Sequence, residues 1–478
     1  MSNISDLCPN SVWNFFSKIA AIPHTSGNES ALGEAIVKFA QARNLEYKYN
    51  QGNVFIFKDA QNSTSKDGVI FQAHIDMVGV KIKDKEFDFK KDPIEMLIED
   101  NFVKANGTTL GADDGIGVAL ILAILDDKTI SHPPIEAIFT IGEETDMVGA
   151  NLLTKEDIHY NQLINLDSED FGEICIGCAG GASYDIEITP DIHEVPKDYC
   201  TIKISIARGL GGHSGIDIDK NRLNCATALL TIISSLFNEG ITFNLSNINS
   251  GFVRNAIPQE GYATISLPEN LLPKALSTLE DAALRLKNRF KESDPNFIVN
   301  CEKIEKENIM FSEDDTLNAI NLRSLNTRVI EETPDHFPVI SANVGVINFE
   351  NGKLNYKILS RFNRPDGFDI ISEKLTSIAT QNKANITLRE KYPCWFTKEE
   401  GKLLKVAKES FTQNYHDNPK VTIIHAGLEC GIFQTLHPSI EIISIGPTIF
   451  DVHTTKEKVD IKSVLDTYNW LLDILNKL

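Results

Sequence analysis

Residues 68–80 read GVIFQAHIDMVGV, a short apolar run that carries a histidine and an aspartate, His74 and Asp76. Runs of this length that are rich in Val, Ile and Phe are typical of buried β-strands. Residues 115–127, GIGVALILAILDD, have the small and aliphatic side chains of a buried helix, and residues 136–144, EAIFTIGEE, form another β-type run. Strands that alternate with helices predict an α/β fold with a largely parallel sheet and helices on both faces.

Acidic and histidine side chains recur directly after such apolar runs. The carboxyl ends of parallel strands meet at one edge of a sheet, where an α/β fold gathers side chains into a shared crevice. Imidazole and carboxylate groups suit Zn²⁺, Mn²⁺ or Co²⁺. They outnumber the ligands that one tetrahedral ion needs, so the pattern predicts a two-metal hydrolase. The residues concerned are His74, Asp76, Asp113, Glu143, Glu144, Asp167 and His453.

The chain has 478 residues, which is too long for one ordinary hydrophobic core and predicts two domains. From about residue 186 the pattern changes to α+β, with alternating strands, amphipathic helices and a hairpin turn at Asn351-Gly352. The α/β pattern returns towards the C-terminus. We therefore expect a catalytic domain formed by residues 1–185 and 393–478, interrupted by an inserted lid or dimerisation domain, residues 186–392.

The formal net charge is −21, from 46 basic and 67 acidic residues. This charge argues against nucleic acid and anionic membranes as partners, because phosphate groups would be repelled. Neither a signal-peptide pattern nor an apolar run of membrane-spanning length is visible, which predicts a cytoplasmic protein. Eight cysteines in a chain of this length do not indicate a disulfide framework, and the single C-x-x-C at residues 175–178 lacks a second pair to complete a zinc site.

Two pairs of neighbouring polar residues suggest a division of roles. Adjacent residues at a strand end point in different directions, so one of Glu143 and Glu144 can bind a metal while the other acts as a general base. An isolated Glu-Glu pair is otherwise typical of solvated surface. His74 and Asp76 share one face of a strand, where Asp76 can accept the second imidazole N–H and fix the tautomer. For Asp167, a helix cap is the alternative to a metal ligand.

A resemblance to a known family rests on ordered motifs spread over nearly the whole chain: HIDMV, GADDGIG, GEETDMVGA, GGHSG, RNAIP, HAGLECGIF and SIGPTIFDVH. At these motifs the chain resembles the co-catalytic metallopeptidases, in particular the aminoacyl-histidine (Xaa-His) dipeptidases. Relatives include aminotripeptidases, aminoacylases and glutamate carboxypeptidases. The resemblance implies a catalytic α/β domain interrupted by a lid domain, two zinc ions, and cleavage of unblocked dipeptides. Mn²⁺ and Co²⁺ suit the same ligands.

Carried over position by position, the resemblance assigns a ligand set to each metal. His74 and Asp167 would bind one ion. Glu144 and His453 would hold the other, and Asp113 would bridge both.

The resemblance also assigns the proton transfer. Glu143 would be the general base that takes the proton of a metal-bridging water to give the attacking hydroxide, and Asp76 would be the hydrogen-bonding partner of a metal-bound histidine. The motif reads ADDG where relatives often carry ADNG, so Asp114 is an alternative to Asp113 as the bridge.

Substrate-binding residues follow from the same motifs: His213, Asn255, Arg361, Gly427 and Glu429. His213, in the glycine-rich GLGGHSG, would stabilise developing negative charge when the lid closes, often from a partner subunit. Arg361 would bind the substrate carboxylate, with Arg364 as a competitor, and Glu429 would receive the free amino group. By analogy, the inserted domain suits a homodimer.

Two other functions are left open by the sequence. A related amidohydrolase of aminotripeptidase, aminoacylase or carboxypeptidase type would share most of these residues. A metal-binding protein without catalysis is disfavoured by Glu143, because a pure binding site needs no base beside its ligands. No G-x-G-x-x-G motif follows a strand, which disfavours a dehydrogenase.

Overall fold

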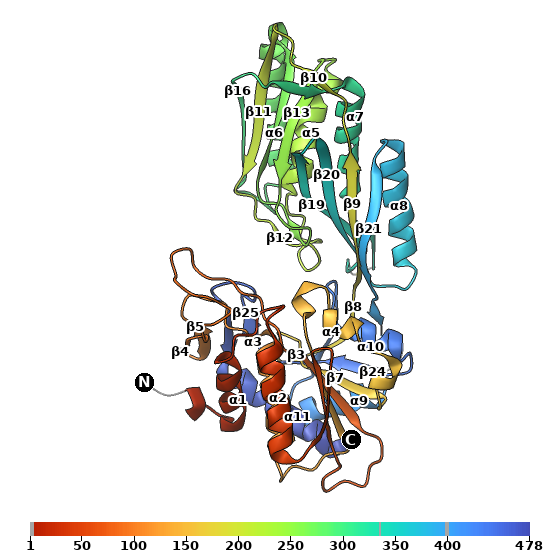
Figure 1. The fold of residues 1–478 in the computed structure, drawn as a ribbon. Helices are drawn as coiled ribbons and strands as arrows, with labels where there is room; N and C mark the ends of the chain where they lie inside the picture. The colour runs from red at the N-terminus through yellow and green to blue at the C-terminus, as the bar shows by residue number, and fades with distance from the viewer. Residues whose placement is uncertain (1–3, 334–335, 397–400) are drawn as a thin grey trace. The chain divides into compact units, whose positions relative to one another are not determined.

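The computed structural model describes residues 4–333, 336–396 and 401–478 (Figure 1). The chain divides into two compact units, each with its own hydrophobic core. The first unit consists of Met1–Cys178, Trp395–Ile423 and Leu428–Leu478, and the second of Ala179–Cys394 and Ile424–Gly427. The limits expected from the sequence, residues 186 and 392, lie in two strands of the second unit, Gly180–Ile188 and Asn385–Tyr392.

The first unit is built on a nine-stranded sheet. Its strands are β1 (Glu46–Asn50), β2 (Asn53–Lys58), β3 (Val69–His74), β6 (Ile135–Thr140), β7 (Gln162–Asn165), β8 (Glu173–Cys178), β22 (Trp395–Phe396), β23 (Lys420–Ile424) and β24 (Glu441–Ser444). The strand order is β1-β2-β6-β3-β7-β24-β8-β22, with β23 beside β8. The four central strands, β6, β3, β7 and β24, run parallel. The outer pairs β1-β2, β2-β6, β24-β8 and β8-β22 are antiparallel.

The principal helices of this unit are α1 (Asn10–Ala20), α2 (Ser30–Arg43), α3 (Ala112–Asp126), α4 (Val148–Asn151), α9 (Lys402–Tyr415), α10 (Cys430–Leu436) and α11 (Ile461–Lys477). Val69, Phe71 and Ala73 of β3 enter a core shared with α1, α3 and α11. Gln72 points to the opposite face of β3, where it bonds Glu429 at the start of α10. Helices therefore cover both faces, and the predicted α/β class is confirmed.

A small antiparallel sheet also belongs to the first unit. It has the order β25 (Ile449–Phe450), β26 (Lys458–Asp460), β5 (Phe102–Ala105) and β4 (Met96–Glu99). The loop between β25 and β26 carries His453. The expectation that His453 would lie on the main sheet is therefore wrong. Three residues of β5, Phe102, Val103 and Lys104, pair with β26, and this pairing anchors the loop.

The second unit contains a nine-stranded antiparallel sheet, with the order β16-β11-β15-β13-β19-β20-β9-β21 and β18 beside β19. These strands are β9 (Gly180–Ile188), β11 (Tyr199–Ala207), β13 (Asn244–Ser250), β15 (Gly261–Pro268), β16 (Ile298–Ile304), β18 (Arg328–Glu332), β19 (Pro338–Glu350), β20 (Lys353–Phe362) and β21 (Asn385–Tyr392). Asn351 and Gly352 both have positive φ, as a tight hairpin turn requires, which confirms the predicted β19–β20 hairpin.

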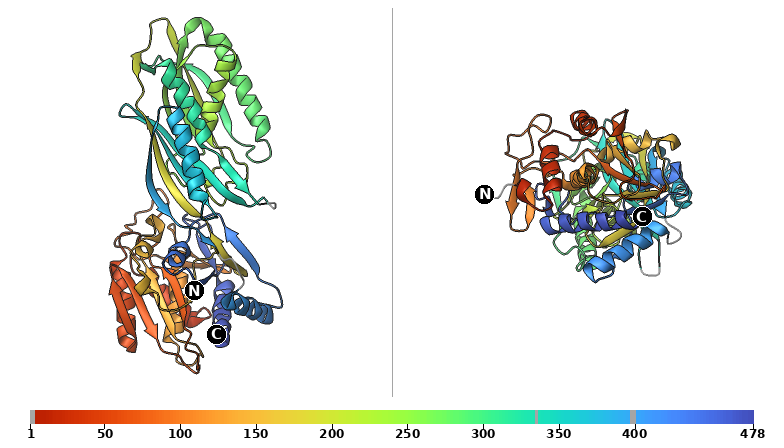
Figure 2. Two further views of the ribbon diagram at one scale, coloured as in Figure 1. Left: turned by 90° about the vertical axis from the view of Figure 1, so that its right-hand side faces the viewer. Right: turned by 90° about the horizontal axis from the view of Figure 1, so that it is seen from below.

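Four longer helices of the second unit pack on this sheet: α5 (Cys225–Asn238), α6 (Leu272–Arg289), α7 (Glu313–Asn321) and α8 (Gly367–Gln381). Alternate residues of β11, from Cys200 to Ile206, enter the same core as these helices. Since alternate residues of a strand share one face, the helices cover one face of the sheet, and Figure 2 shows this layer. The predicted α+β insertion is thus an antiparallel sheet with helices on one side.

Among the described residues, no helix is both long enough and apolar enough to span a membrane.

Candidate active site

His74 and Asp167 meet at the carboxyl edge of the parallel strands. His74 is the last residue of β3, and Asp167 follows the end of the neighbouring parallel strand β7. His74 Nε2 lies 3.4 Å from Asp167 Oδ1. No helix begins directly after Asp167 in the described chain, so the helix-cap alternative is excluded.

Asp113 lies at the start of α3 and faces two histidines. Its Oδ1 is 3.1 Å from His74 Nε2, and its Oδ2 is 3.2 Å from His453 Nε2. Gly111, in the left-handed region with a φ of 72°, precedes the helix, and Asp113 itself has non-helical dihedral angles. Each carboxylate oxygen of Asp113 is thus directed at a different imidazole.

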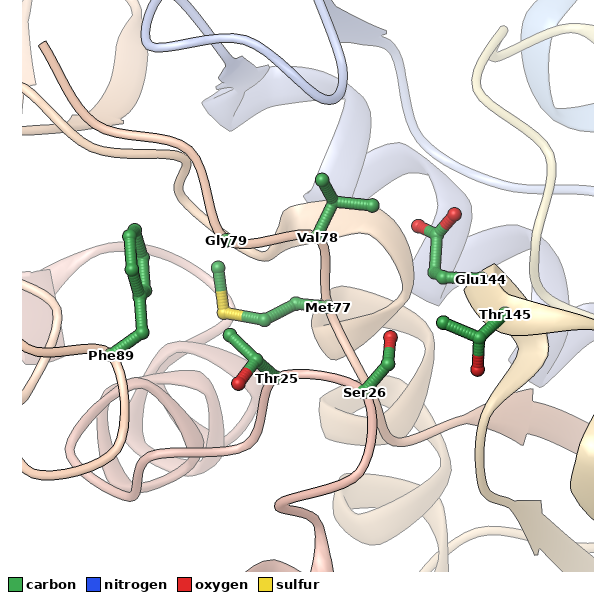
Figure 3. A pocket seen from close by; sticks show the side chains of 8 residues that line it. All are labelled: Thr25, Ser26, Met77, Val78, Gly79, Phe89, Glu144 and Thr145. Atoms are coloured by element: carbon green, nitrogen blue, oxygen red, sulfur yellow. The ribbon is translucent and has the colours of Figure 1, made fainter. Parts of the chain in front are cut away.

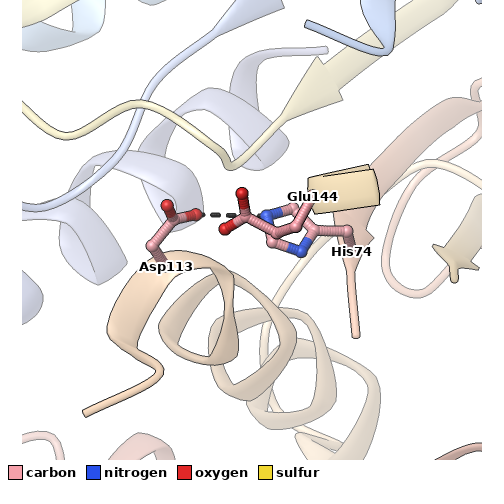
Figure 4. Close-up of side chains that lie close together, drawn as sticks. All are labelled: His74, Asp113 and Glu144. Atoms are coloured by element: carbon pink, nitrogen blue, oxygen red, sulfur yellow. Dashed lines mark hydrogen bonds and ion pairs between the residues drawn. The ribbon is translucent and has the colours of Figure 1, made fainter. Parts of the chain in front are cut away.

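Glu144 completes the group from a neighbouring turn. Its Oε1 lies 2.6 Å from His453 Nε2. Glu143 and Glu144 belong to a single 3-10 turn, Glu143–Thr145, that follows β6, and not to the end of a strand as expected. Gly142, with a φ of 60°, ends the extended backbone, so the two side chains diverge because of the turn. Figure 4 shows Glu144, Asp113 and His74 directed towards one another.

Asp76 has a wider role than the one predicted. Its Oδ1 accepts the backbone N–H of Glu143 (3.0 Å), and its Oδ2 accepts the backbone N–H of Glu144 (3.2 Å) and the hydroxyl of Ser26 (2.8 Å). His74 Nδ1 donates to the backbone carbonyl of Asp76 at 3.1 Å, closer than the 3.4 Å to its carboxylate. The carboxylate therefore fixes the Glu143 turn, while the carbonyl orients the imidazole.

Both ring nitrogens of His74 face acceptors. Carbonyl and carboxylate oxygens only accept, so Nδ1–H donates to the Asp76 carbonyl and Nε2–H donates to Asp113. A bound metal ion would take the place of the Nε2 proton, and the hydrogen bond at Nδ1 would then keep the Nε2 lone pair directed at the ion.

The buried carboxylates and imidazoles of this group shift one another's pKa values. Although burial opposes it, Asp167 and Asp113 raise the pKa of His74 well above its usual value. Likewise against burial, Asp113 and Glu144 raise the pKa of His453 to about 11. Burial raises the pKa of Asp167 to about 7. The crowded carboxylates thus stabilise positive charge, which is the electrostatic condition for binding a divalent cation.

The donor atoms also fit a metal ion geometrically. One ligand atom from each of His74, Asp113 and Glu144 lies within 4.8 Å of the others, and the same holds for His74, Asp114 and Asp167. Asp114 is almost completely buried, and its Oδ1 accepts the backbone N–H of Gly117. Its Oδ2 has no hydrogen-bond partner among the described residues. Nitrogen and oxygen donors of this kind suit divalent cations of the zinc and manganese type.

A pocket adjoins this group on the Glu144 side (Figure 3). Its volume is about 350 Å³. It is lined by Thr25, Ser26, Met77, Val78, Gly79, Phe89, Glu144 and Thr145. Apolar side chains therefore form much of the wall of a cavity that has a candidate metal ligand at one side.

Glu429 contacts two of the parallel strands, β3 and β6, through Gln72 and Thr140. It is fully buried, and its Oε2 accepts from Gln72 Nε2 and Thr140 Oγ1, both at 2.6 Å. Burial raises the pKa of Glu429 to about 7. Contact between Glu429 and a substrate amine stays a prediction.

The remaining predicted substrate residues belong to the second unit. Arg361, only 4% exposed, places Nη2 3.0 Å from His213 Nε2 and donates from Nη1 to the Tyr392 hydroxyl at 3.1 Å. Asn255 is exposed, and its carbonyl accepts the Ser214 N–H beside His213. Gly427 is half-buried at the end of the short segment 424–427.

The histidine of HAGLECG, His425, also belongs to the second unit. His425 is buried and pairs with Ser341 Oγ at 2.7 Å and with Asn363. A Cβ atom on Gly215 would lie 2.0 Å from the His425 carbonyl oxygen and 2.8 Å from Arg361 Nε. Only glycine allows the loop of the GGHSG motif to approach this closely.

The sequence of this chain matches a known protein family. The model of peptidase family M20/M25/M40 matches residues 70–477. The chain belongs to this family. It is 34% identical to the cytosol non-specific dipeptidase of Escherichia coli (strain K12) over 483 aligned residues. The alignment covers 100% of this chain and 99% of that protein. The predicted resemblance is confirmed.

Solved structures of related peptidases share the fold of this chain. The aminoacylhistidine dipeptidase of Vibrio alginolyticus is 33% identical and superposes with a TM-score of 0.86, covering 100% of this chain and 98% of its own. A tripeptidase of Staphylococcus aureus, 16% identical, shares the fold with a TM-score of 0.57 over 98% of both chains. Family membership therefore extends over both units.

Proposed function

We propose that this M20 family member is a two-metal dipeptidase that hydrolyses unblocked dipeptides, including Xaa-His. The observation that carries the proposal is Asp113, whose two oxygens face two different histidines. His74 with Asp167 would hold one cation, and His453 with Glu144 the other, with Asp113 shared between them. Zn²⁺ suits this set best, and Mn²⁺ and Co²⁺ also fit.

The residues around this set would divide the reaction between them. Two bound divalent cations would polarise a water molecule and lower its pKa. Glu143 takes the proton from the attacking water and passes it to the departing amine. Burial raises the pKa of Glu143 well above its usual value, which suits a carboxyl group that must hold a proton during turnover. Asp76 holds the backbone of this base in place.

A panel of substrates tests the proposed function. Metal-free protein is reconstituted with each candidate ion and assayed on Ala-His, a tripeptide and an N-acyl amino acid. We expect the dipeptide to have the highest kcat/KM. A preference for the N-acyl amino acid or the tripeptide would instead support the aminoacylase or aminotripeptidase alternative. Cytoplasmic location fits the name of the E. coli relative, and dimerisation through the second unit stays a prediction.

Arg361 is the better candidate for binding the substrate carboxylate. Among the described residues, no carboxylate lies within ion-pair distance of the Arg361 guanidinium, and its buried Nε has no hydrogen-bond partner. Arg364, the competitor, is paired with Glu331 at 2.7 Å and with Asp366 at 2.5 Å. A buried arginine without a counter-charge favours an anionic ligand.

Arg361→Met is expected to raise KM for Ala-His by roughly 10- to 100-fold, because hydrogen bonds to charged groups contribute about 1.5–3 kcal/mol. Kinetics on the dipeptide and on its C-terminal amide measure this, since the amide lacks the carboxylate and should lose little. Arg364→Met is the matched control and should change KM less than about 3-fold, as expected for an exposed ion pair. A similar rise in KM for the dipeptide and for its amide would show that Arg361 does not bind the substrate carboxylate.

The pocket beside Glu144 is suited to an apolar side chain of the dipeptide. Val78→Trp would fill it, so kcat/KM for a leucine-containing dipeptide should fall at least about 10-fold relative to Gly-Gly. Comparing Leu-Gly with Gly-Leu identifies which substrate residue enters. Val421→Trp, at an exposed position of β23, is the control and should leave the ratio unchanged. An unchanged ratio in Val78→Trp would remove the pocket from substrate selection.

A further inference from the structure

One buried carboxylate outside the predicted site lies against it. Glu457 is only 3% exposed and follows His453 on the loop between β25 and β26. Its Oε2 accepts the backbone N–H groups of Leu110 at 2.7 Å and Gly111 at 3.2 Å. Its Oε1 accepts those of Ala112 at 2.8 Å and Asp113 at 3.5 Å. Four consecutive N–H groups therefore converge on a single side chain.

These N–H groups lead into α3, where the first turn of a helix has no intrahelical partners for its donors. A carboxylate at this end is also favoured by the helix dipole. An ordinary cap would come from the residue just before the helix. Here the N-cap is Gly111, which has no side chain, and the carboxylate comes from a segment 344 residues away from Asp113.

The loop that supplies this carboxylate is also the loop that supplies His453. His453 Nε2 lies 3.2 Å from Asp113 Oδ2, while the Glu457 carboxylate accepts the backbone N–H groups of Asp113 and of the three residues before it. Asp113 and His453 are thus joined twice, once through their side chains and once through Glu457. A change in one connection would alter the spacing of the other.

We propose that Glu457 is a positioning residue that sets the spacing of Asp113 and His453 and thereby the affinity for the cation that these two residues share. The inference rests on the proposed two-metal function. Glu457 touches no substrate and is not a ligand in this role. It acts through the backbone of one ligand and the loop of another, as residues behind metal ligands commonly do.

Glu457→Gln tests the proposal, because the amide keeps the volume but directs an NH₂ group at backbone donors. Affinities are measured by chelator competition with Co²⁺, together with the Co²⁺ absorption spectrum. We expect one of the two ions to bind about 10- to 100-fold more weakly, with a changed spectrum, and the other ion to be affected less. Glu457→Asp keeps the charge on a shorter stem and should give an intermediate loss.

Asp460→Asn is the matched control. Asp460 caps α11 by accepting the Ser463 N–H at 2.7 Å, so it is a carboxylate cap of the same region that touches no candidate ligand. Its metal affinities should match the wild type. The proposal is overturned if Glu457→Gln binds both ions as tightly as the wild type. It is also overturned if both affinities fall equally along with the melting temperature of the metal-free protein, since that would indicate a structural cap. Failure of the wild type to bind two ions would instead reject the proposed function.

Discussion

Replacing Glu143 by alanine is expected to lower kcat for dipeptide hydrolysis by about 10²–10⁴-fold, the usual contribution of a general acid–base group. The protein should keep both metal ions, because His74, Asp113, Asp167, Glu144 and His453 supply the donors without Glu143. Steady-state kinetics and metal analysis on the same preparation check both parts.

The local contacts favour this separation of roles. Asp76 holds the backbone N–H groups of Glu143 and Glu144, and those bonds do not involve the side chain that is removed. The turn should therefore survive the substitution. Glu143→Gln, which keeps the side-chain volume, should lose a similar share of turnover. If metal content and activity fell in parallel in both variants, Glu143 would be a ligand and the proposed proton transfer would be wrong.

Asp113→Ala should empty both metal positions together. Each oxygen of Asp113 faces a different histidine, so its removal takes a donor from each side of the group. It also leaves the remaining carboxylates and cations without the shared negative charge that offsets repulsion between two dications. Metal content after dialysis, measured by mass spectrometry, gives the result, and dipeptidase activity should disappear with the ions.

Asp114→Asn is the natural comparison, since Asp114 is the alternative bridge. One of its oxygens accepts the backbone N–H of Gly117, a bond that an asparagine carbonyl can also accept. We expect this variant to retain both ions. Full metal content in Asp113→Ala together with loss in Asp114→Asn would transfer the bridge to the neighbouring residue.

The meeting of His74, Asp113 and Asp167 could be predicted from sequence, because each follows a local rule. His74 and Asp167 come at the ends of apolar strands, and parallel strands deliver such residues to one edge. Asp113 lies at the start of a helix that is apolar on all sides and almost entirely buried, and this burial fixes the position of the helix.

Other features depend on contacts that no local pattern encodes. The expectation for Glu143 and Glu144 used strand alternation, but Gly142 adopts a positive φ and turns the chain. His453 was expected on the main sheet, whereas pairing of β26 with β5 places it on a separate one. Glu457 was missed because its partners begin 347 residues earlier in the chain, and a lone glutamate in a polar loop is typical of exposed surface.

The substrate-binding residues were predicted from the resemblance to a family, because no pattern of hydrophobicity or charge singles them out. The proposed role of Arg361 in carboxylate binding came from motif position, and the sequence did not separate Arg361 from Arg364. In the structure Arg364 is paired with two carboxylates, while Arg361 is buried beside His213 and Tyr392, and we base the proposal on this difference. Burial and pairing of charges are properties of the folded chain, so this choice required coordinates.

The most direct measurement is anomalous X-ray diffraction at the zinc edge on crystals of the reconstituted protein. Two peaks are predicted, one between His74 and Asp167 and one between Glu144 and His453, with Asp113 touching both. A single peak, or peaks away from Asp113, would contradict a shared two-ion centre and with it the proposed hydrolysis.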